Sequence, residues 1–257
     1  YTLPCLSDNY AYVIFNSAKG TAAIVDVPEA GPLVDKISEL NVPVTDIFLT
    51  HHHSDHVDGL ADLQAALTNS LSQAPAQVIG ARADAHRLPA LDQSVSPGDC
   101  LTLCGIQGDI YDVSGHTLGH LALHLPSARA VFTADSLMAM GCGRLFEGSA
   151  VQMWHSLQQL RSLPQDTWVY SGHEYTTSNM AFTQSLGEDN PAIAARAAQI
   201  TKDRAAGRPT VPSPLALEMQ TNPFMRADDP ALKAAMGMPE STAAQVFAEI
   251  RTRKDKF

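Results

Sequence analysis

The chain has 257 residues, of which 45% are hydrophobic, and it carries a formal net charge of −10 at pH 7. A chain of this size can bury a full core, and it contains no run of 18 apolar residues of the kind that spans a membrane. Its negative charge argues against general nucleic-acid binding, because neutralising phosphates requires an electropositive face. We therefore expect a soluble globular protein that binds neither nucleic acid nor membrane.

The cysteines and the start of the chain bear on its compartment. Cys5, Cys100, Cys104 and Cys142 include no Cys-x-x-Cys pair and form no dense framework. Thiols that stay reduced are typical of the cytosol. The first residues also lack the basic-then-apolar pattern of a signal peptide. We predict a cytoplasmic protein whose cysteines are small core residues.

The first metal-competent residues lie between two predicted elements. Residues 44–50 predict a short buried strand, and residues 58–67 predict a helix with Leu60, Leu63 and Leu67 on one face. The sequence between the two elements reads Thr50-His-His-His-Ser-Asp-His56. This spacing predicts a turn that presents several metal ligands together.

The composition of this turn favours a catalytic metal site. Imidazole and carboxylate suit Zn²⁺, Fe or Mn²⁺, and the absence of cysteine argues against a closed thiolate site. His51 and His53 can converge on one point while Asp55 and His56 face another, so that one loop serves two metals. The alternative is a solvated His-rich loop, but such loops lack the interleaved aspartate and the flanking strand and helix.

Three further candidates each follow a strand-like run directly: His116, Asp135 and His173. Catalytic residues gathered from the carboxyl ends of several strands are typical of layered α/β enzymes. Together with the first turn, they give a set of five histidines and two aspartates.

The chain divides into two predicted parts. Up to residue 174, short strands alternate with helices, which predicts an αββα sandwich. From residue 175 the alternating apolar pattern disappears, and residues 192–206 and 241–256 have helical character. Three prolines between residues 209 and 214 interrupt these helices. We expect a catalytic domain over residues 1–174 and an α-helical substrate-binding domain over residues 175–257.

Seven short motifs are spread over nearly the whole chain: Thr50-His-His-His-Ser-Asp-His56, Ser114-Gly-His-Thr-Leu-Gly-His120, Phe132-Thr-Ala-Asp135, Gly141-Cys-Gly-Arg144, Ser171-Gly-His-Glu-Tyr175, Asn222-Pro-Phe-Met-Arg226 and Arg251-Thr-Arg-Lys254. Together they resemble the metallo-β-lactamase superfamily and, within it, glyoxalase II, the hydroxyacylglutathione hydrolases. The His/Asp motif alone specifies the superfamily. The Gly-Cys-Gly segment and the C-terminal motifs specify the glyoxalase II branch.

This resemblance implies a metallo-β-lactamase-type αββα sandwich, a C-terminal helical domain and two divalent metal ions. Zinc is the favoured ion, with iron or manganese as alternatives. By position, the resemblance implies that His51, His53 and His116 bind one ion and that Asp55, His56 and His173 bind the other. Asp135 is implied to bridge the two ions. The residues implied as contacts of glutathione are Arg144, Phe146, Tyr175, Arg251 and Lys254.

The chain departs from the family pattern at a few positions. Phe146 stands where a tyrosine is usual, so that a hydroxyl contact to the substrate is missing. Arg144 stands where lysine is common. Ser54 and Ala134 replace an aromatic residue and a glycine within the metal-binding motifs, but neither change removes a ligand.

The implied reaction is hydrolysis of S-D-lactoylglutathione and related 2-hydroxyacylglutathiones to glutathione and the hydroxy acid, a step in methylglyoxal detoxification. A metal-bound hydroxide is the expected nucleophile, with Asp55 and Asp135 as catalytic residues that hold the metals. The leaving thiol has a pKa near ~8.5, so it departs without obligatory protonation. We expect a monomer that takes a small glutathione thioester and no macromolecular partner.

Two other functions are considered. The first is oxidation of glutathione persulfide by the sulfur-dioxygenase relatives, which use a single iron and generally lack the long C-terminal domain. In the second, the metals have only a structural role and hold the loops together. Seven candidate ligands, however, exceed the number that a four-coordinate structural site needs. The basic residues from 251 to 256 have a plainer interpretation too, as a solvated helix end.

Overall fold

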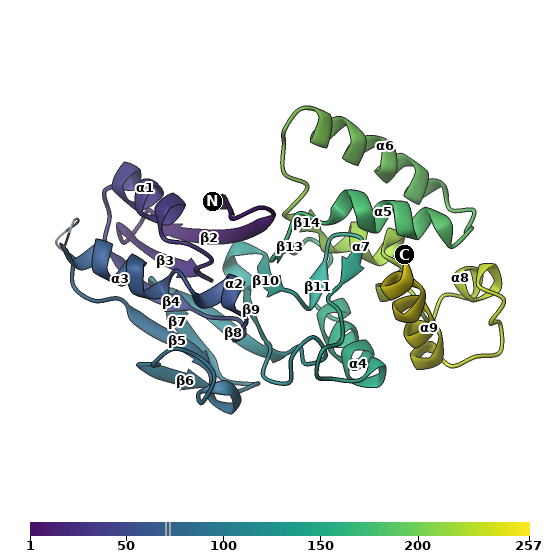
Figure 1. Ribbon diagram of the computed structural model, residues 1–257, viewed down its shortest axis with the longest axis horizontal. Coiled ribbons are helices and arrows are strands. Elements are labelled where there is room, and N and C mark those ends of the chain that lie inside the picture. The colour runs from purple at the N-terminus through teal and green to yellow at the C-terminus, as the bar shows by residue number, and fades with distance from the viewer. Residues whose placement is uncertain (70, 72) are drawn as a thin grey trace. The chain divides into compact units, whose positions relative to one another are not determined.

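The computed structural model describes residues 1–69, 71 and 73–257 (Figure 1). The chain forms two compact units. One unit comprises residues 1–112 and 119–132, and the other comprises residues 113–118 and 133–257. Within the described residues, every helix is too short or too polar to cross a membrane.

A six-stranded sheet of order β1-β2-β3-β4-β5-β6 lies in the first unit. Its strands are β1 (Thr2–Cys5), β2 (Asn9–Asn16), β3 (Thr21–Val25), β4 (Val44–Phe48), β5 (Gln77–Ala81) and β6 (Gln93–Val95). The first three strands pair antiparallel, whereas β3 to β6 pair parallel. Because neighbouring parallel strands end at the same edge of a sheet, the segments that follow β3 and β4 meet there.

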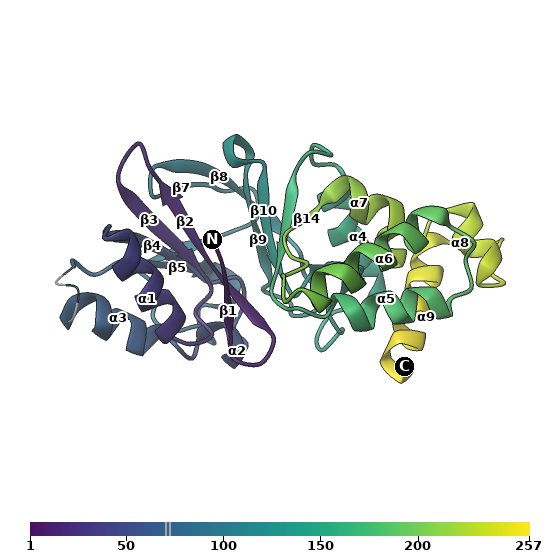
Figure 2. The same cartoon turned by 90° about the horizontal axis from the view of Figure 1, so that it is seen from above.

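Two helices cover one side of this sheet, α1 (Gly31–Leu40) and α3 (Leu60–Asn69). Their apolar faces are buried, through Leu33 and Ile37 in α1 and through Leu60, Leu63 and Leu67 in α3. Figure 2 shows α1 and α3 on one side of the sheet and the strands β7 (Cys100–Leu103), β8 (Ile106–Asp112) and β9 (Leu121–Leu125) on the other. Tyr12 and Phe132 link the two sheets, with ring centroids 5.3 Å apart.

The second sheet has the strand order β14-β13-β10-β9-β8-β7. Its remaining strands are β10 (Ala130–Ala134), β13 (Trp168–Ser171) and β14 (Ser213–Pro214). β9 and β10 are buried along their whole length, as expected of central strands with both faces covered. A short hairpin follows β10 and consists of β11 (Leu137–Met138) and β12 (Gly141–Cys142).

The second unit is rich in helices: α4 (Ala150–Arg161), α5 (Thr176–Ser185), α6 (Pro191–Ala205), α7 (Leu215–Thr221), α8 (Pro230–Ala235) and α9 (Ala243–Lys256). Capping boxes start α4 at Ser149 and α9 at Thr242. Phe224 is fully buried, and its ring contacts those of Phe182 and Phe247 at 6.2 and 5.5 Å. These aromatic side chains form part of the core that joins the helices.

The predicted elements are largely confirmed. The helices expected over residues 192–206 and 241–256 correspond to α6 and α9. The expected irregular turn at the first motif is partly wrong, because Ser54–Val57 forms a single helical turn, α2, with His53 at its N-cap. The C-terminal region also adds β14 to the second sheet, beside β13. The division at residue 174 stays a prediction.

A buried carboxylate organises the second unit. Glu218 is fully buried and pairs with Arg196 of α6. It also accepts hydrogen bonds from the backbone N–H of Met140, at 2.9 Å, from Ser213 Oγ, at 2.5 Å, and from Asn222 Nδ2, at 3.0 Å. One charge thus connects the β11–β12 hairpin, the strand β14 and the helices α6 and α7.

We predict that Glu218→Ala lowers the free energy of unfolding by about 3–5 kcal/mol, because it leaves the Arg196 guanidinium buried without its counter-charge. Glu249→Ala is the matched control, since Glu249 and Arg253 form an exposed pair on α9. That change should cost less than about 1 kcal/mol. Denaturant unfolding measures both, and equal losses for the two variants contradict the role given to Glu218.

Candidate metal centre and substrate contacts

Among the residues that the structure describes, the potential metal ligands fall into two groups: His51, His53, His116 and Asp135 in one, and Asp55, His56 and His173 in the other. These are the seven residues that the sequence motifs single out. Four of them belong to the first unit and three to the second.

In the first unit, the ligand candidates follow β4 on an extended segment and the short helix α2. His51 Nδ1 lies 3.0 Å from Thr50 Oγ1, and His51 Nε2 lies 3.1 Å from His53 Nδ1. The rings of His51 and His56 have centroids 4.3 Å apart. The fold therefore gathers the imidazoles of this motif instead of spreading them over a surface loop.

Asp26 fixes the orientation of this motif from behind. Its Oδ2 lies 2.8 Å from His56 Nδ1, and its two carboxylate oxygens accept hydrogen bonds of 2.8 Å from the N–H and the hydroxyl of Thr50. A carboxylate on one ring nitrogen fixes the histidine tautomer and directs the other nitrogen, here Nε2, to a metal. Asp58, two residues after His56 in the chain, is exposed.

Asn9 and His120 also support ligand candidates of the first unit. Asn9 donates hydrogen bonds of 3.0 Å from Nδ2 to both the main-chain oxygen and Oδ2 of Asp55. The ring of His120, which is fully buried, stacks on His51 with centroids 4.5 Å apart. Asn9 opens β2 and Asp26 follows β3, so each is a polar residue buried at a strand end, but that position alone does not reveal which ligand it supports.

In the second unit, Asp135 lies between two histidines. Its Oδ2 is 3.3 Å from His116 Nε2 and 3.3 Å from His173 Nε2. His116 donates through Nδ1 to the main-chain oxygen of Arg144, at 2.8 Å, which leaves Nε2 as its ligand atom. One carboxylate oxygen thus faces one histidine from each group, an arrangement that a bridging ligand requires.

These separations fit a transition metal. Two ligand atoms at about 2.0–2.1 Å from one tetrahedral ion lie about 3.3 Å apart. The distances between neighbouring donor atoms within each unit are 3.1 and 3.3 Å. The donor set of imidazole nitrogens and carboxylate oxygens suits Zn, Fe or Mn.

The chain passes so close to these ligands at Gly143 that a side chain does not fit. A Cβ there would lie 1.9 Å from the main-chain oxygen of Asp135 and 2.9 Å from His116 Nδ1.

The adjacent Cys142 is buried, and burial raises the pKa of its thiol to about 11. The raised pKa favours a protonated thiol at neutral pH, and Cys142 belongs to neither group of candidate ligands.

Two aromatic residues cover candidate ligands in the second unit. Tyr175 stacks on His173, with centroids 4.6 Å apart and planes inclined by 6°. Phe146 is 60% exposed and meets the ring of His116 at 5.2 Å and a steep angle. Both residues implied as aromatic substrate contacts therefore lie directly against metal-ligand candidates.

Two of the three basic candidates, Arg251 and Arg144, contact Asp255. Arg251 is buried and donates to the main-chain oxygen of Cys142, at 3.0 Å, and to Asp255 Oδ1, at 3.1 Å from Nε. Arg144 is exposed, and its Nε lies 3.5 Å from the same carboxylate oxygen. Lys254 donates to the main-chain oxygen of Ser178 at 3.2 Å. Burial, followed by the charge of Arg251, lowers the pKa of Lys254.

Comparison with known proteins identifies the family. A model described as "Metallo-beta-lactamase superfamily" matches residues 7–173, and one described as "Hydroxyacylglutathione hydrolase C-terminus" matches residues 174–257. A hydroxyacylglutathione hydrolase of Ruegeria pomeroyi is 56% identical to this chain, with 100% of the chain and 98% of the relative covered. The chain belongs to the hydroxyacylglutathione hydrolase family of the metallo-β-lactamase superfamily.

A second relative supports this membership, and a solved structure shows the same fold. A hydroxyacylglutathione hydrolase of Roseobacter denitrificans is 52% identical over 100% of this chain and 98% of its own length. The solved structure of ETHE1 from Myxococcus xanthus has a TM-score of 0.66 at 23% identity, covering 98% of this chain and 89% of that one. The predicted glyoxalase II resemblance and the α/β sandwich with a C-terminal helical domain are thereby confirmed.

We predict that Asp26→Asn weakens metal binding by about 10–100-fold, because the amide no longer holds the His56 ring as the carboxylate does. Asp46→Asn is the matched control, since Asp46 is also buried in the first sheet but accepts from Thr45 and from the main chain of Cys104. Competition with a chelator measures both affinities. Equal affinities of the two variants contradict the role of Asp26.

Proposed function

We propose that this chain hydrolyses the thioester of S-D-lactoylglutathione and related 2-hydroxyacylglutathiones to glutathione and the hydroxy acid, D-lactate in the first case. The observation that carries the proposal is the 56% identity to a hydroxyacylglutathione hydrolase over the full chain, which includes the C-terminal region specific to that family. Both groups of His/Asp ligands that such chemistry requires are present.

We assign the ligands by group. His51, His53 and His116 would hold one ion, Asp55, His56 and His173 the other, and Asp135 both, with zinc favoured over iron or manganese. Two such ions, when bound, lower the pKa of a coordinated water and polarise the thioester carbonyl. The contacts of Asp135 Oδ2 with His116 and His173 support its shared role.

The chain's own residues position the reaction. Asp55 and Asp135 supply negative charge to the metals, and the hydrogen bonds from Asn9 keep the Asp55 carboxylate in one orientation. Water adds to the carbonyl carbon, its proton passes to solvent, and the C–S bond breaks. Because the thiol of glutathione has a pKa near ~8.5, the thiolate leaves without an acid from the protein, and the buried Cys142 takes no part.

We assign glutathione recognition to the basic and aromatic candidates of the second unit. Glutathione carries two carboxylates, and a protein with a net charge of −10 needs local cations to bind it. Arg144 is exposed and Lys254 is half-buried, so both can reach a ligand, whereas Arg251 holds the main chain of Cys142 in place.

We assign Tyr175 and Phe146 to glutathione recognition as well. Tyr175 offers a hydroxyl, whereas Phe146 contacts the substrate through its ring only.

We further propose that the chain works as a monomer in the cytoplasm, where the free thiols of its four cysteines persist.

Metal content distinguishes this function from the dioxygenase alternative. We predict that the reconstituted protein binds about two transition-metal ions per chain, because a carboxylate shared by two histidines is suited to a pair of ions. Elemental analysis measures the ratio, and a thioester assay accompanies it. Saturation at one iron per chain, with oxygen uptake on glutathione persulfide, would replace the hydrolase by a sulfur dioxygenase.

Lys254 provides a test of glutathione recognition. We predict that Lys254→Ala raises KM for a glutathione thioester with little change in kcat, by about 1–2 kcal/mol of binding free energy, because the contact lies far from the scissile bond. Lys256→Ala removes the same charge from an exposed position on the same helix and should leave KM unchanged.

A small thioester without glutathione serves as the second substrate. Lys254→Ala should leave its kinetics unaltered, and added salt should partly reproduce the defect on the glutathione thioester. If Lys254→Ala and Lys256→Ala behave alike on both substrates, the basic end of α9 is a solvated helix terminus and the assignment of Lys254 is lost.

A further inference from the structure

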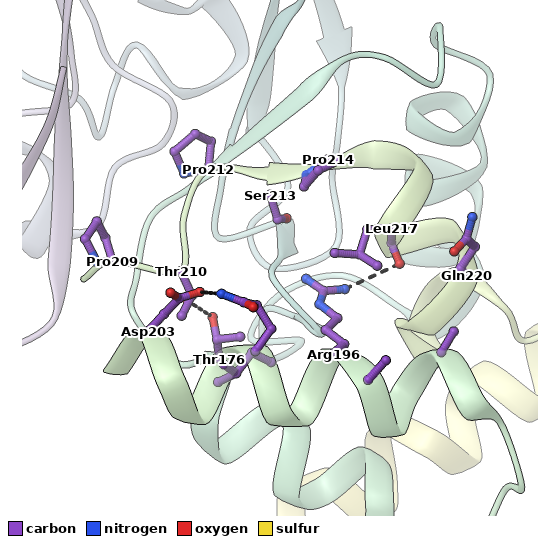
Figure 3. Close-up of a pocket in the computed structure, with 14 residues that line it drawn as sticks. Thr176, Arg196, Asp203, Pro209, Thr210, Pro212, Ser213, Pro214, Leu217 and Gln220 are labelled. Atoms are coloured by element: carbon purple, nitrogen blue, oxygen red, sulfur yellow. Dashed lines mark hydrogen bonds between the residues drawn. The ribbon is translucent and has the colours of Figure 1, made fainter. Parts of the chain in front are cut away.

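A pocket with a volume of about 490 Å³ lies in the second unit, between α6 and the segment of residues 209–214 that leads to α7 (Figure 3). Its walls are largely apolar and include Ala195 and Ile200 of α6, Pro212 and Pro214 of that segment, and Leu217 of α7. None of the described residues that line it is assigned to the metals or to glutathione. The volume is in the range of sites for small molecules.

The charged groups at this pocket are already neutralised. Arg196, at its centre in Figure 3, donates through Nη1 to Thr221 Oγ1 and Leu217 O and pairs with the buried Glu218. Asp203 at its edge pairs with Arg208 at 2.5 Å and accepts a hydrogen bond from Gln199. An anion would have to displace Glu218 from a buried network, and a cation would have to displace Arg208. A neutral ligand meets neither cost.

The uncharged polar groups define the rest of the ligand. The exposed side-chain amides of Gln199 and Gln220 and the hydroxyl of Thr176 line the pocket beside its apolar walls. An amide donates and accepts, so it suits a carbonyl or hydroxyl group on the ligand. The fitting class is a neutral molecule with an aliphatic or aromatic body and a carbonyl or hydroxyl at one end.

One wall of the pocket is hydrogen-bonded to the segment that carries His173. Thr210 Oγ1 lies 2.6 Å from Thr176 Oγ1 and 2.6 Å from Glu174 Oε1. The N–H of Thr210 donates to Glu174 Oε2 at 2.8 Å. Glu174 directly follows His173 in the chain. A ligand that fixes residues 209–214 therefore restrains the backbone next to a metal-ligand candidate.

We propose that this pocket is an effector site for a neutral, mainly apolar small molecule, and that its occupancy is transmitted through Thr210 and Glu174 to the metal centre. The existence of the site depends only on the pocket. Its effect on turnover rests on the proposed function.

The binding test uses prodan, a neutral naphthyl ketone whose fluorescence shifts to the blue in an apolar site. Ala195→Phe places a large ring in the pocket, whereas Ala198→Phe places the same ring on the exposed face of α6, outside the lining. The wild type and Ala198→Phe should bind prodan alike, and Ala195→Phe should bind it about tenfold more weakly or worse. Equal binding by the two variants overturns the site.

The charge of the ligand is tested with 6-propionyl-2-naphthoate, an anion of similar size and shape. It should bind the wild type about tenfold more weakly than prodan, because its carboxylate meets the Glu218 network. Binding as tight as that of prodan, and lost in Ala195→Phe, overturns the assignment of a neutral ligand.

The kinetic test uses the metal-loaded protein and a glutathione thioester. Saturating prodan should change kcat/KM by about fivefold in the wild type and in Ala198→Phe. Thr210→Val removes the hydroxyl contact with Glu174 and Thr176, so it should still bind prodan but lose most of the kinetic effect. If prodan binds the wild type without any kinetic effect, the coupling is overturned. A kinetic effect that persists in Ala195→Phe overturns the coupling as well. Absence of thioesterase activity refutes the proposed function, and the fluorescence result still decides the site.

Discussion

The buried carboxylate of Asp26 is the interaction on which the ligand geometry of the first unit depends. It receives both donors of Thr50 and faces His56, so one side chain connects the end of β3, the end of β4 and α2. The parallel pairing of β3 and β4 makes this possible, because it brings both strand ends to one edge of the sheet. A catalytic metal site needs ligands held in place before the metal arrives, and here hydrogen bonds behind the ligands provide that order.

In the second unit, amide side chains hold the backbone near the candidate ligands in place. Asn222 donates to the main-chain oxygens of Met138 and Gly141, and Asn179 donates to that of Ala139. Both amides therefore hold the β11–β12 hairpin, which follows Asp135 after a single residue. The C-terminal helices thus have two roles. They carry basic residues that are candidates for substrate contacts, and they fix the backbone beside a candidate bridging ligand.

Much of this arrangement was predictable from the sequence because metal ligands occur in short, dense patterns. His51 to His56 and the residues after β8, β10 and β13 stand out by residue type and by their place at strand ends. Asp26 and Asn9 could not be found in the same way, since their role depends on which strands pair and nothing near them in the chain marks it. The engagement of Arg251 was equally hidden, because its partners at Cys142 and Asp255 depend on tertiary packing.

The burial of Cys142 has a consequence for the chemical durability of the protein. A thiol whose pKa is raised to about 11 is almost entirely protonated near neutral pH, and only the thiolate reacts readily with aldehydes and oxidants. Cys5 and Cys104 are likewise buried, with thiol pKa values raised to about 11. These three cysteines therefore offer electrophiles almost no thiolate to attack.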